Sequence, residues 1–262
     1  DILAVTNAIN GGHISQGRVT RMFEDQLAER LGVPYVVCTT SGTTALTMAL
    51  LAKGTAQKIG VVVPDRTWIA TAHAALLIGA DVRLHDVDDR GLLPKVPRLP
   101  YGRRTFIPVN LNGRLADCEP QDIEDACQSF PVAPRGLIAC YSMSTAKLLP
   151  TGQGGFCATR DEGLYRELRA LRTHDVEDAM VPQVLQWRRF GYNFRYTDIQ
   201  AAIGLSQLTR LDERIARLEE IRALYVSNLP PYLEMLPCDG VPLYSEVLYR
   251  DSEHLRAYLR ER

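Results

Sequence analysis

The sequence predicts an α/β protein whose central sheet is mainly parallel and flanked by helices. Short runs rich in apolar and β-branched residues alternate with amphipathic stretches along the chain, and this alternation is typical of domains built on a parallel sheet. A length of 262 residues is enough for one large domain with a substantial core. The expected strands cover residues 35–38, 60–63, 82–84, 105–109 and 137–141.

Helical spacing marks segments between and after these strands. Phe23, Leu27 and Leu31 recur on one face of a helix, and a second apolar run over residues 45–50 follows a start rich in Ser and Thr. A third helix is expected from about residue 198 to 224. There an apolar stripe opposes a charged side, which we interpret as a solvated face.

Two features of the chain bear on its domain organisation. A proline pair at 230–231 predicts a boundary between a main domain, residues 1–229, and an abbreviated C-terminal domain, residues 230–262. The segment between 111 and 123 is also short, because a parallel crossover normally needs a dozen residues or more. We therefore expect no full crossover helix there.

Charge and hydropathy exclude several classes of function. The chain has 30 basic and 31 acidic residues and a net charge of -1, so it has no electrostatic footprint for nucleic acid or an anionic membrane. No apolar stretch reaches the ~20 residues of a membrane span, and the start lacks the basic and apolar regions of a signal peptide. A cytoplasmic protein is expected.

The cysteines and histidines do not form a metal-binding pattern. Six cysteines are scattered without a C-x-x-C pair, and five histidines lie far apart. We interpret the cysteines as small buried hydrophobic residues in a reducing compartment and assign no metal.

The turn over residues 39–46 combines hydroxyls, a glycine and backbone N–H groups where a strand meets a helix. Such a helix start suits a phosphate group, and it equally suits a well-capped helix with no ligand. No G-x-G-x-x-G or P-loop motif occurs in the chain, so a dinucleotide or P-loop nucleotide is not indicated.

Lys147 lies just beyond a predicted buried strand, among small residues and before a glycine-rich stretch. A desolvated lysine in such a place can lose its proton and attack an aldehyde. The alternative is an ordinary solvated surface lysine.

Taken together and in this order, several stretches resemble the DegT/DnrJ type of sugar aminotransferases, pyridoxal phosphate (PLP) enzymes of fold type I. The resemblance covers most of residues 14–225 and implies that fold. The matching stretches are residues 14–17 with 23–24, then 41–46, 64–71, 123–128, 142–155, and 191–195 running into 198–202.

The resemblance implies roles for two catalytic residues. Lys147 is similar to the lysine that carries the cofactor covalently and then moves a proton between substrate and cofactor. Asp125 is similar to the carboxylate that keeps the pyridinium nitrogen protonated, so that the ring can accept electrons. As an isolated acid, Asp125 would be a solvated surface charge.

Five further residues are implied to bind the cofactor. Gln128 resembles the residue beside the ring oxygen, and Trp68 resembles the aromatic residue that stacks on the ring. Gly42, Thr43 and Ser142 resemble the phosphate cradle. The alternatives are an ordinary polar surface position for Gln128 and a core position for Trp68.

Asn193 resembles an asparagine that reaches the cofactor phosphate of the neighbouring subunit, which implies a homodimer. Arg195 is expected near it, with a salt-bridged or exposed arginine as the alternative.

The chain departs from the family pattern at four positions. Ser144 and Asn110 stand where histidine is common, Gln153 stands where glutamate is common, and Asp175 follows His174 where glycine is usual. We expect these differences to affect substrate preference more than cofactor binding.

Two functions from different classes follow. The first is transfer of an amino group from a donor such as glutamate to a keto-sugar, expected to be nucleotide-linked. The second is a degenerate family member that binds PLP or a partner without turnover. The presence of Lys147 favours the first and argues against the family's dehydratase branch, in which this lysine is replaced.

Overall fold

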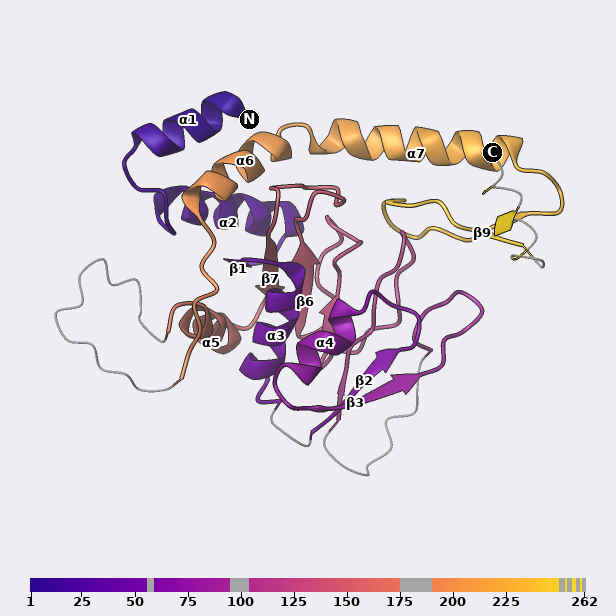
Figure 1. The fold of residues 1–262 in the computed structure, drawn as a ribbon, viewed down its shortest axis with the longest axis horizontal. Coiled ribbons are helices and arrows are strands. Elements are labelled where there is room, and N and C mark those ends of the chain that lie inside the picture. Colours follow the sequence, from indigo (N-terminus) through magenta and orange to yellow (C-terminus); the bar gives the residue numbers. More distant parts are fainter. Residues whose placement is uncertain are drawn as a thin grey trace.

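The computed structural model describes residues 1–55, 59–94, 104–174 and 190–249, and positions 253, 256, 257 and 260. Two sheets lie at the centre, with helices on both sides (Figure 1). The first has the order β1-β7-β6-β5 and the second the order β3-β2-β4. Their strands are β1 (Tyr35–Thr39), β2 (Gly60–Pro64), β3 (Asp81–His85), β4 (Arg104–Phe106), β5 (Ile123–Asp125), β6 (Ile138–Ser142) and β7 (Gly155–Thr159).

Among the described residues, one isolated bridge joins the two sheets at their edges. Val109, just beyond β4, pairs in parallel with Asp125 of β5, and the backbone N–H of Asp125 donates to the Pro108 carbonyl at 2.9 Å. The pairs β2–β3, β2–β4 and β5–β6 are parallel, whereas β7 runs antiparallel to both of its neighbours. The expected α/β fold with a mainly parallel sheet is confirmed, with β7 as the exception.

Alternate residues of the strands face two different cores, as the two-residue period of a strand requires. Tyr141 and Phe156 lie in the core formed with α2 (Arg18–Leu31), α6 (Asp198–Leu208) and the start of α7 (Leu211–Asn228). Cys140 and Cys157 lie in the opposite core, formed with α3 (Gly42–Ala52), α4 (Ala70–Leu76) and α5 (Glu162–Arg172). The sheet is therefore the middle of three layers.

The expected helix over 198–224 is wrong in one respect, because it is two helices. α6 ends at Leu208 and α7 begins at Leu211. The Thr209 hydroxyl donates to the Ser206 carbonyl at 2.8 Å, Arg210 has non-helical dihedral angles, and Leu211 is only 2% exposed. Breaking the helix at this point lets Leu211 enter the core.

The short connection between Leu111 and Ile123 contains no helix, as its length predicts. It holds a tight turn at Leu111–Arg114. Beyond Pro230 the described chain forms a small antiparallel pair, β8 (Glu234–Met235) with β9 (Val247–Leu248). This C-terminal segment packs beside the 111–114 turn, where the N–H groups of Asp239 and Gly240 both donate to the Gly113 carbonyl.

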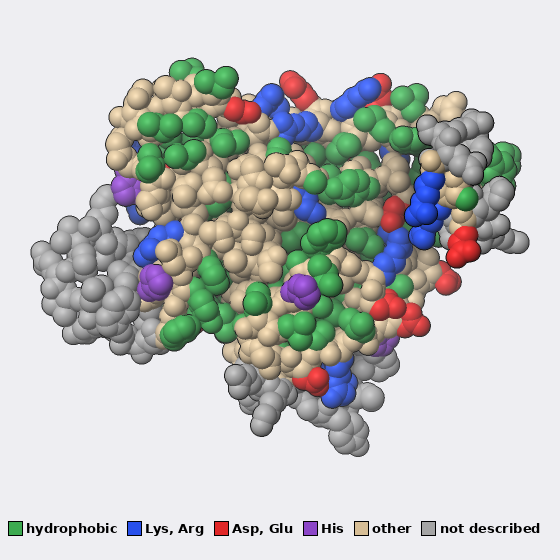
Figure 2. All heavy atoms as spheres, in the orientation of Figure 1, with side chains coloured by type: hydrophobic (Ala, Val, Ile, Leu, Met, Phe, Trp, Pro, Cys, Tyr) green, Lys and Arg blue, Asp and Glu red, His purple; other side chains and the backbone are tan. Residues whose placement is uncertain are grey.

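Several large hydrophobic side chains lie at the surface. Figure 2 shows them gathered over α1 (Ile2–Asn10), where Ile2 is 86% exposed. Trp68 is 72% exposed and Ile69 60% exposed. Within the described part of the chain, no helix is long and apolar enough to cross a membrane.

Candidate active site

A cavity of about 590 Å³ opens at the ends of β5 and β6. The structure brings together seven of the eight residues singled out in the sequence as cofactor-binding or catalytic. These seven line the cavity: Gly42, Thr43, Trp68, Asp125, Gln128, Ser142 and Lys147.

The amino end of α3 forms one wall. Ser41 caps this helix by accepting from the Thr44 N–H at 3.1 Å, and the Thr44 hydroxyl accepts from the Ser41 N–H at 2.9 Å. Gly42 and Thr43 then present the first turn of the helix to the cavity, where unpaired N–H groups and the helix dipole favour an anion. The capped helix, one of the two interpretations of this turn, is present, and the cap lies at a cavity.

Gly155 allows this wall to lie against the sheet. A Cβ atom at Gly155 would be 2.3 Å from the Ser41 carbonyl oxygen and 2.6 Å from the Gly42 nitrogen. Because these neighbours are backbone atoms that cannot move aside, only glycine fits there. The glycine-rich stretch after Lys147 therefore brings β7 into contact with the start of α3.

Lys147 lies in the connection between β6 and β7. Ser142 and Gly155 pair across the two strands, and the Met143 N–H donates to the Gly154 carbonyl at 2.8 Å. Within the connection, the Lys147 N–H donates to the Ser144 carbonyl at 3.0 Å. Its side chain is half-buried and lines the cavity rather than the open surface.

Asp125 ends β5 with a carboxylate that is 5% exposed. Its Oδ2 accepts from the Thr71 hydroxyl at 2.8 Å, and its Oδ1 accepts from the Cys127 N–H at 3.1 Å. Asp125 is therefore not a solvated surface charge. Each oxygen retains lone pairs for a further donor in the cavity.

Cys127 contributes a thiol to the same wall. Burial, followed by the negative charge of Asp125 and a hydrogen bond with it, raises the pKa of this thiol well above its usual value. The Cys127 thiol is therefore protonated at neutral pH and acts as a neutral surface beside the cavity. Cys38, Cys140 and Cys157 are buried, as the sequence predicts for all six cysteines, whereas Cys118 and Cys238, like Cys127, are only partly buried.

Gln128 and Trp68 lie at other points of the cavity wall. The backbone N–H of Asn112 donates to Gln128 Oε1 at 3.1 Å. Trp68 is largely exposed, so it is not a core residue, and one side of its ring is available to a ligand.

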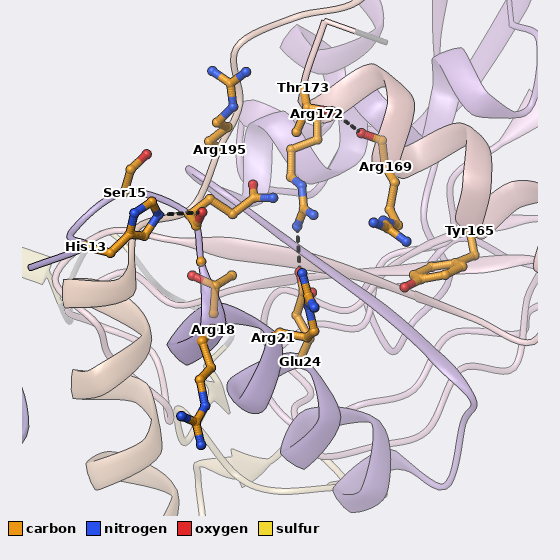
Figure 3. A pocket seen from close by; sticks show the side chains of 13 residues that line it. His13, Ser15, Arg18, Arg21, Glu24, Tyr165, Arg169, Arg172, Thr173 and Arg195 are labelled. Carbon is orange, nitrogen blue, oxygen red and sulfur yellow. Dashed lines mark hydrogen bonds and ion pairs between the residues drawn. The ribbon is translucent and has the colours of Figure 1, made fainter. Parts of the chain in front are cut away.

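Asn193 is the eighth residue, and it does not line this cavity. Its side chain is exposed, and its Oδ1 accepts from Arg195 Nη1 at 3.1 Å. Arg195 lines a second cavity of about 750 Å³ between α2 and α5 (Figure 3).

In this second cavity, a buried ion pair connects α5 to α2 and β1. Arg172 is 3% exposed, and its Nη1 lies 2.6 Å from Glu24 Oε1 and 3.0 Å from the Cys38 carbonyl oxygen. Glu24 also accepts from the Cys38 N–H at 2.7 Å. The pair therefore has a structural explanation, since it fixes three elements to one another.

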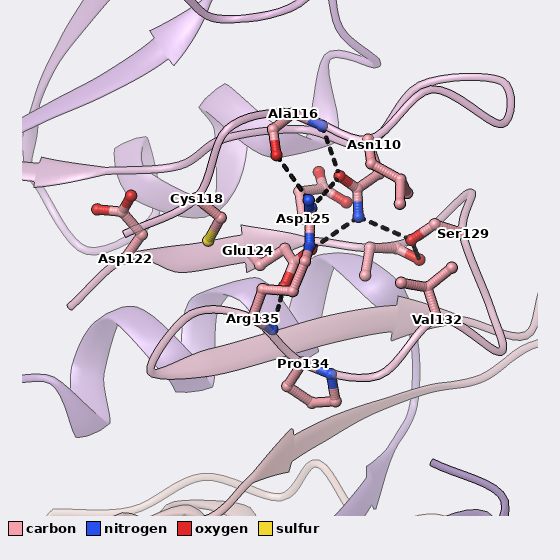
Figure 4. Close-up of polar contacts among 12 residues, drawn as sticks. Asn110, Ala116, Cys118, Asp122, Glu124, Asp125, Ser129, Val132, Pro134 and Arg135 are labelled. Carbon is pink, nitrogen blue, oxygen red and sulfur yellow. Dashed lines mark hydrogen bonds and ion pairs between the residues drawn. The ribbon is translucent and has the colours of Figure 1, made fainter. Parts of the chain in front are cut away.

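The four departures from the family pattern lie in different places. Ser144 and Gln153 line the first cavity, and Asp175 lies outside the described residues. Asn110 is 1% exposed and lies in a buried polar network, where its amide donates to Glu124 and Ser129 and accepts from the Ala116 N–H and Arg135 (Figure 4). All its hydrogen-bonding capacity is used, so Asn110 supports the fold beside β5 and not the cavity wall.

Among the residues to which the sequence assigned no role, Cys127, Asn112 and Tyr244 line the cavity, and Thr71 contacts Asp125 without lining it. Thr71 lies in one of the stretches that carry the resemblance, and Cys127 follows Asp125 by two positions, so both were close to residues with assigned roles. Asn112 and Tyr244 lie in segments without a helical or strand pattern. Only the folded chain brings these two to the cavity.

Comparison with known proteins supports the resemblance found in the sequence. The model of the DegT/DnrJ/EryC1/StrS aminotransferase family matches residues 1–242. The GDP-perosamine synthase of Caulobacter vibrioides is 34% identical over 237 residues, which cover 82% of this chain and 63% of that protein. The UDP-2-acetamido-2-deoxy-3-oxo-D-glucuronate aminotransferase of Pseudomonas aeruginosa is 30% identical over 281 residues, which cover 96% and 76% of the two chains.

Comparison with solved structures gives a similar result. The crystal structure of S. venezuelae DesV, in complex with a ketimine intermediate, superposes with a TM-score of 0.88 at 25% identity and covers 99% of this chain and 76% of that one. The chain spans less than two thirds of the length of the Caulobacter protein. Sequence, fold and the grouping of residues at the cavity agree, and the chain belongs to the DegT/DnrJ/EryC1/StrS aminotransferase family.

Proposed function

We propose that the protein is a PLP-dependent aminotransferase that moves an amino group from a donor such as glutamate to a keto-sugar linked to a nucleotide. The observation that carries this proposal is the placement of Lys147, Asp125 and the amino end of α3 around one cavity. When bound, PLP would supply an aldehyde for a lysine or substrate amine and a ring that accepts electrons.

The residues at the cavity fit PLP in three respects. The first turn of α3, with the nearby Ser142 hydroxyl, would hold the phosphate. The buried Asp125 carboxylate would hold a proton on the ring nitrogen. Trp68 would cover one face of the ring, and Cys127, a neutral thiol, fits beside it without adding charge.

Lys147 would carry the cofactor and then take and return a proton beside it. The β6–β7 connection that holds this lysine is closed at its neck by the pairing of the two strands, which keeps both of its ends beside the cavity. A nucleophile held close to its target loses less freedom when it reacts.

The substrate class is supported by the named relatives. One is a GDP-perosamine synthase and another is an aminotransferase of a UDP-linked 3-oxo sugar acid. Ser144 and Gln153, which differ from the usual family residues, line the cavity. We assign these two residues to substrate preference.

A homodimer completes the proposal. Asn193 is exposed and lies outside the cavity of its own chain, which suits a residue that reaches the cofactor phosphate of a second copy. Trp68, at the cavity, and the adjacent Ile69 are exposed hydrophobic residues, and a second copy would cover them. Residues 1–229 would form the cofactor-binding domain and 230–262 the C-terminal one. A cytoplasmic location is proposed from the composition and from six cysteines that form no disulfide.

An absorption spectrum with and without glutamate tests the function. We expect the protein with bound PLP to be yellow, and borohydride should fix the cofactor covalently at Lys147. Added glutamate should remove the yellow absorption band. A keto-sugar acceptor should then restore it. A Lys147→Ala variant is the control and should take no covalent label. A yellow protein that glutamate leaves unchanged would identify the degenerate binder, and a label on another residue would contradict the role of Lys147.

A further inference from the structure

The turn at Leu111–Arg114 has an unusual backbone. Asn112 has φ 53° and Gly113 has φ 83°, and Leu111 and Arg114 exchange two N–H to carbonyl hydrogen bonds, both 3.0 Å long. Two residues with positive φ between paired neighbours form a tight hairpin turn, for which Asn-Gly is the favoured sequence. The backbone N–H of Asn112 is thereby turned away from the hairpin and donates to Gln128 Oε1.

This contact determines which way the Gln128 amide faces. A backbone N–H can only donate, so the atom of Gln128 that meets it must be the oxygen. The amide NH2 group is then left to donate elsewhere, and Gln128 lines the cavity. A donor is what the ring oxygen of the proposed cofactor requires.

The C-terminal segment holds the other side of this turn. Arg114 is fully buried, and its Nη2 forms an ion pair with Glu246. Glu246 also pairs with Arg66 at 2.7 Å. One carboxylate therefore holds Arg114, the last residue of the turn, against the C-terminal segment.

The turn and the C-terminal segment are also in close contact through their backbones. A Cβ atom at Gly113 would lie 2.5 Å from Cys238 Sγ and 2.9 Å from the Val241 carbonyl oxygen. Two residues before Glu246, Tyr244 lines the cavity and donates from its hydroxyl to the Ala146 carbonyl at 3.2 Å. A change in the seating of this segment would therefore reach the cavity.

We propose that Glu246 and Asn112 are positioning residues for Gln128: the carboxylate holds the turn, and the turn fixes the amide so that it donates into the cavity. The inference rests on the proposed PLP site, and it goes beyond it by assigning a function to the C-terminal segment. Glu246 acts through the turn and does not touch the cofactor.

A pH titration of the absorption of the Lys147-linked cofactor tests this chain of contacts. Loss of a donor leaves the ring oxygen a stronger base, which holds a shared proton more tightly. We expect Gln128→Ala to raise the pKa of the chromophore by about half to one pH unit, the size of one hydrogen bond. Glu246→Gln should raise it in the same direction by less, and the double variant should match Gln128→Ala alone, because residues acting in series are not additive.

Glu162→Gln is the matched control. It is the same chemical change at an ion pair with Arg166 on α5, where the two side chains are 57% and 71% exposed and lie away from the turn. This variant should titrate like the wild type. Asn112→Gly is a second, milder variant, since glycine keeps the N–H but frees the backbone of the turn, so that the N–H is held less firmly against Gln128 Oε1. It should also raise the pKa, and it keeps the test decisive if Glu246→Gln does not fold.

Two results would overturn the positioning role. They are an unchanged chromophore pKa in Glu246→Gln or Asn112→Gly with full cofactor occupancy, and shifts that add in the double variant. A wild-type chain without a Lys147-linked chromophore would instead contradict the proposed function.

Discussion

The Thr71 hydroxyl donates to the Asp125 carboxylate at 2.8 Å, although the two residues are 54 positions apart in the chain. Thr71 is fully buried, and its oxygen also lies 3.0 Å from the Trp68 carbonyl. The hydroxyl has one proton, and the charged carboxylate is the stronger acceptor. The start of α4 thus fixes the orientation of the Asp125 side chain.

Replacing Thr71 by valine should weaken PLP binding about tenfold, the effect of one hydrogen bond to a charged group. The reason is that Asp125 loses the donor that orients it. Fluorescence or absorbance titration with PLP measures the dissociation constant. Thr71→Ser keeps the hydroxyl and should bind nearly as the wild type does, and equal affinity in the valine variant would contradict this role.

Asp125→Asn should give a coloured protein with strongly reduced amino transfer. A neutral amide cannot hold a proton on the ring nitrogen as a carboxylate can. Single-turnover rates with glutamate provide the measurement. Near-normal rates would rule out the proposed partnership of Asp125 with the ring nitrogen.

Subunit mixing should restore activity to two inactive variants. Lys147→Ala and Asn193→Ala each lose an essential residue, but a mixed dimer has one site with both residues intact if Asn193 serves its neighbour. We expect activity to return after subunit exchange, as followed by a coupled transaminase assay. Heterodimers that form but stay inactive would show that Asn193 does not act across the interface.

Arg172→Met should destabilise the fold by about 3–5 kcal/mol, because it leaves Glu24 partly buried without a counter-charge. Arg172 is 3% exposed and the Glu24 side chain 13% exposed. The matched control is Arg166→Met, whose pair with Glu162 is 71% and 57% exposed and which should cost no more than about 0.5 kcal/mol. Urea midpoints compare the two, and equal midpoints would contradict the structural role of the Arg172–Glu24 pair.

Glu246 makes the stability of the fold depend on pH in a defined direction. Burial alone would raise the pKa of this carboxyl, but the hydrogen bond from Arg114 and the charges of Arg114 and Arg66 outweigh it, and the pKa is lowered. A carboxyl with a lowered folded-state pKa stabilises the fold above its unfolded-state value, about 4.3, and that contribution is lost as the pH falls through the folded-state pKa.

The difference in stability between wild type and Glu246→Gln should therefore be largest near neutral pH and shrink in acid. Urea midpoints measured from pH 3 to 7 follow this difference. A difference that stays constant across the range would show that the ionised carboxylate contributes nothing specific.

The sequence predicted the parts of the fold that have strong local patterns. Strands β1, β2, β3 and β6 and helices α2 and α3 lie where apolar runs and helical spacing placed them. Strand β7 was not predicted, because Gly155–Thr159 follows a glycine-rich stretch and becomes a strand only through pairing with β1 and β6. The break between α6 and α7 was also missed, since the apolar stripe continues across it in the sequence.

In the candidate site, too, the residues in local motifs were predicted and those brought together by folding were not. Lys147, Asp125 and the α3 turn were identified because each belongs to a contiguous motif. Asn112 and Tyr244 reach the cavity, and Thr71 reaches Asp125, through contacts between distant segments that the sequence alone does not show. The orientation of Gln128 depends on the backbone dihedral angles of Asn112. An Asn-Gly pair favours such angles, but the sequence does not fix them.

The antiparallel direction of β7 affects the connection that carries Lys147. Because β7 returns alongside β6, the connection that carries Lys147 is closed at its neck by the Ser142–Gly155 pair and by the Met143 and Thr151 N–H groups. Its ends cannot separate without unzipping two central strands, so the entropy of closing this loop is lost when the sheet forms and not when a ligand arrives. Binding of a cofactor therefore does not have to bring the two ends of this connection together.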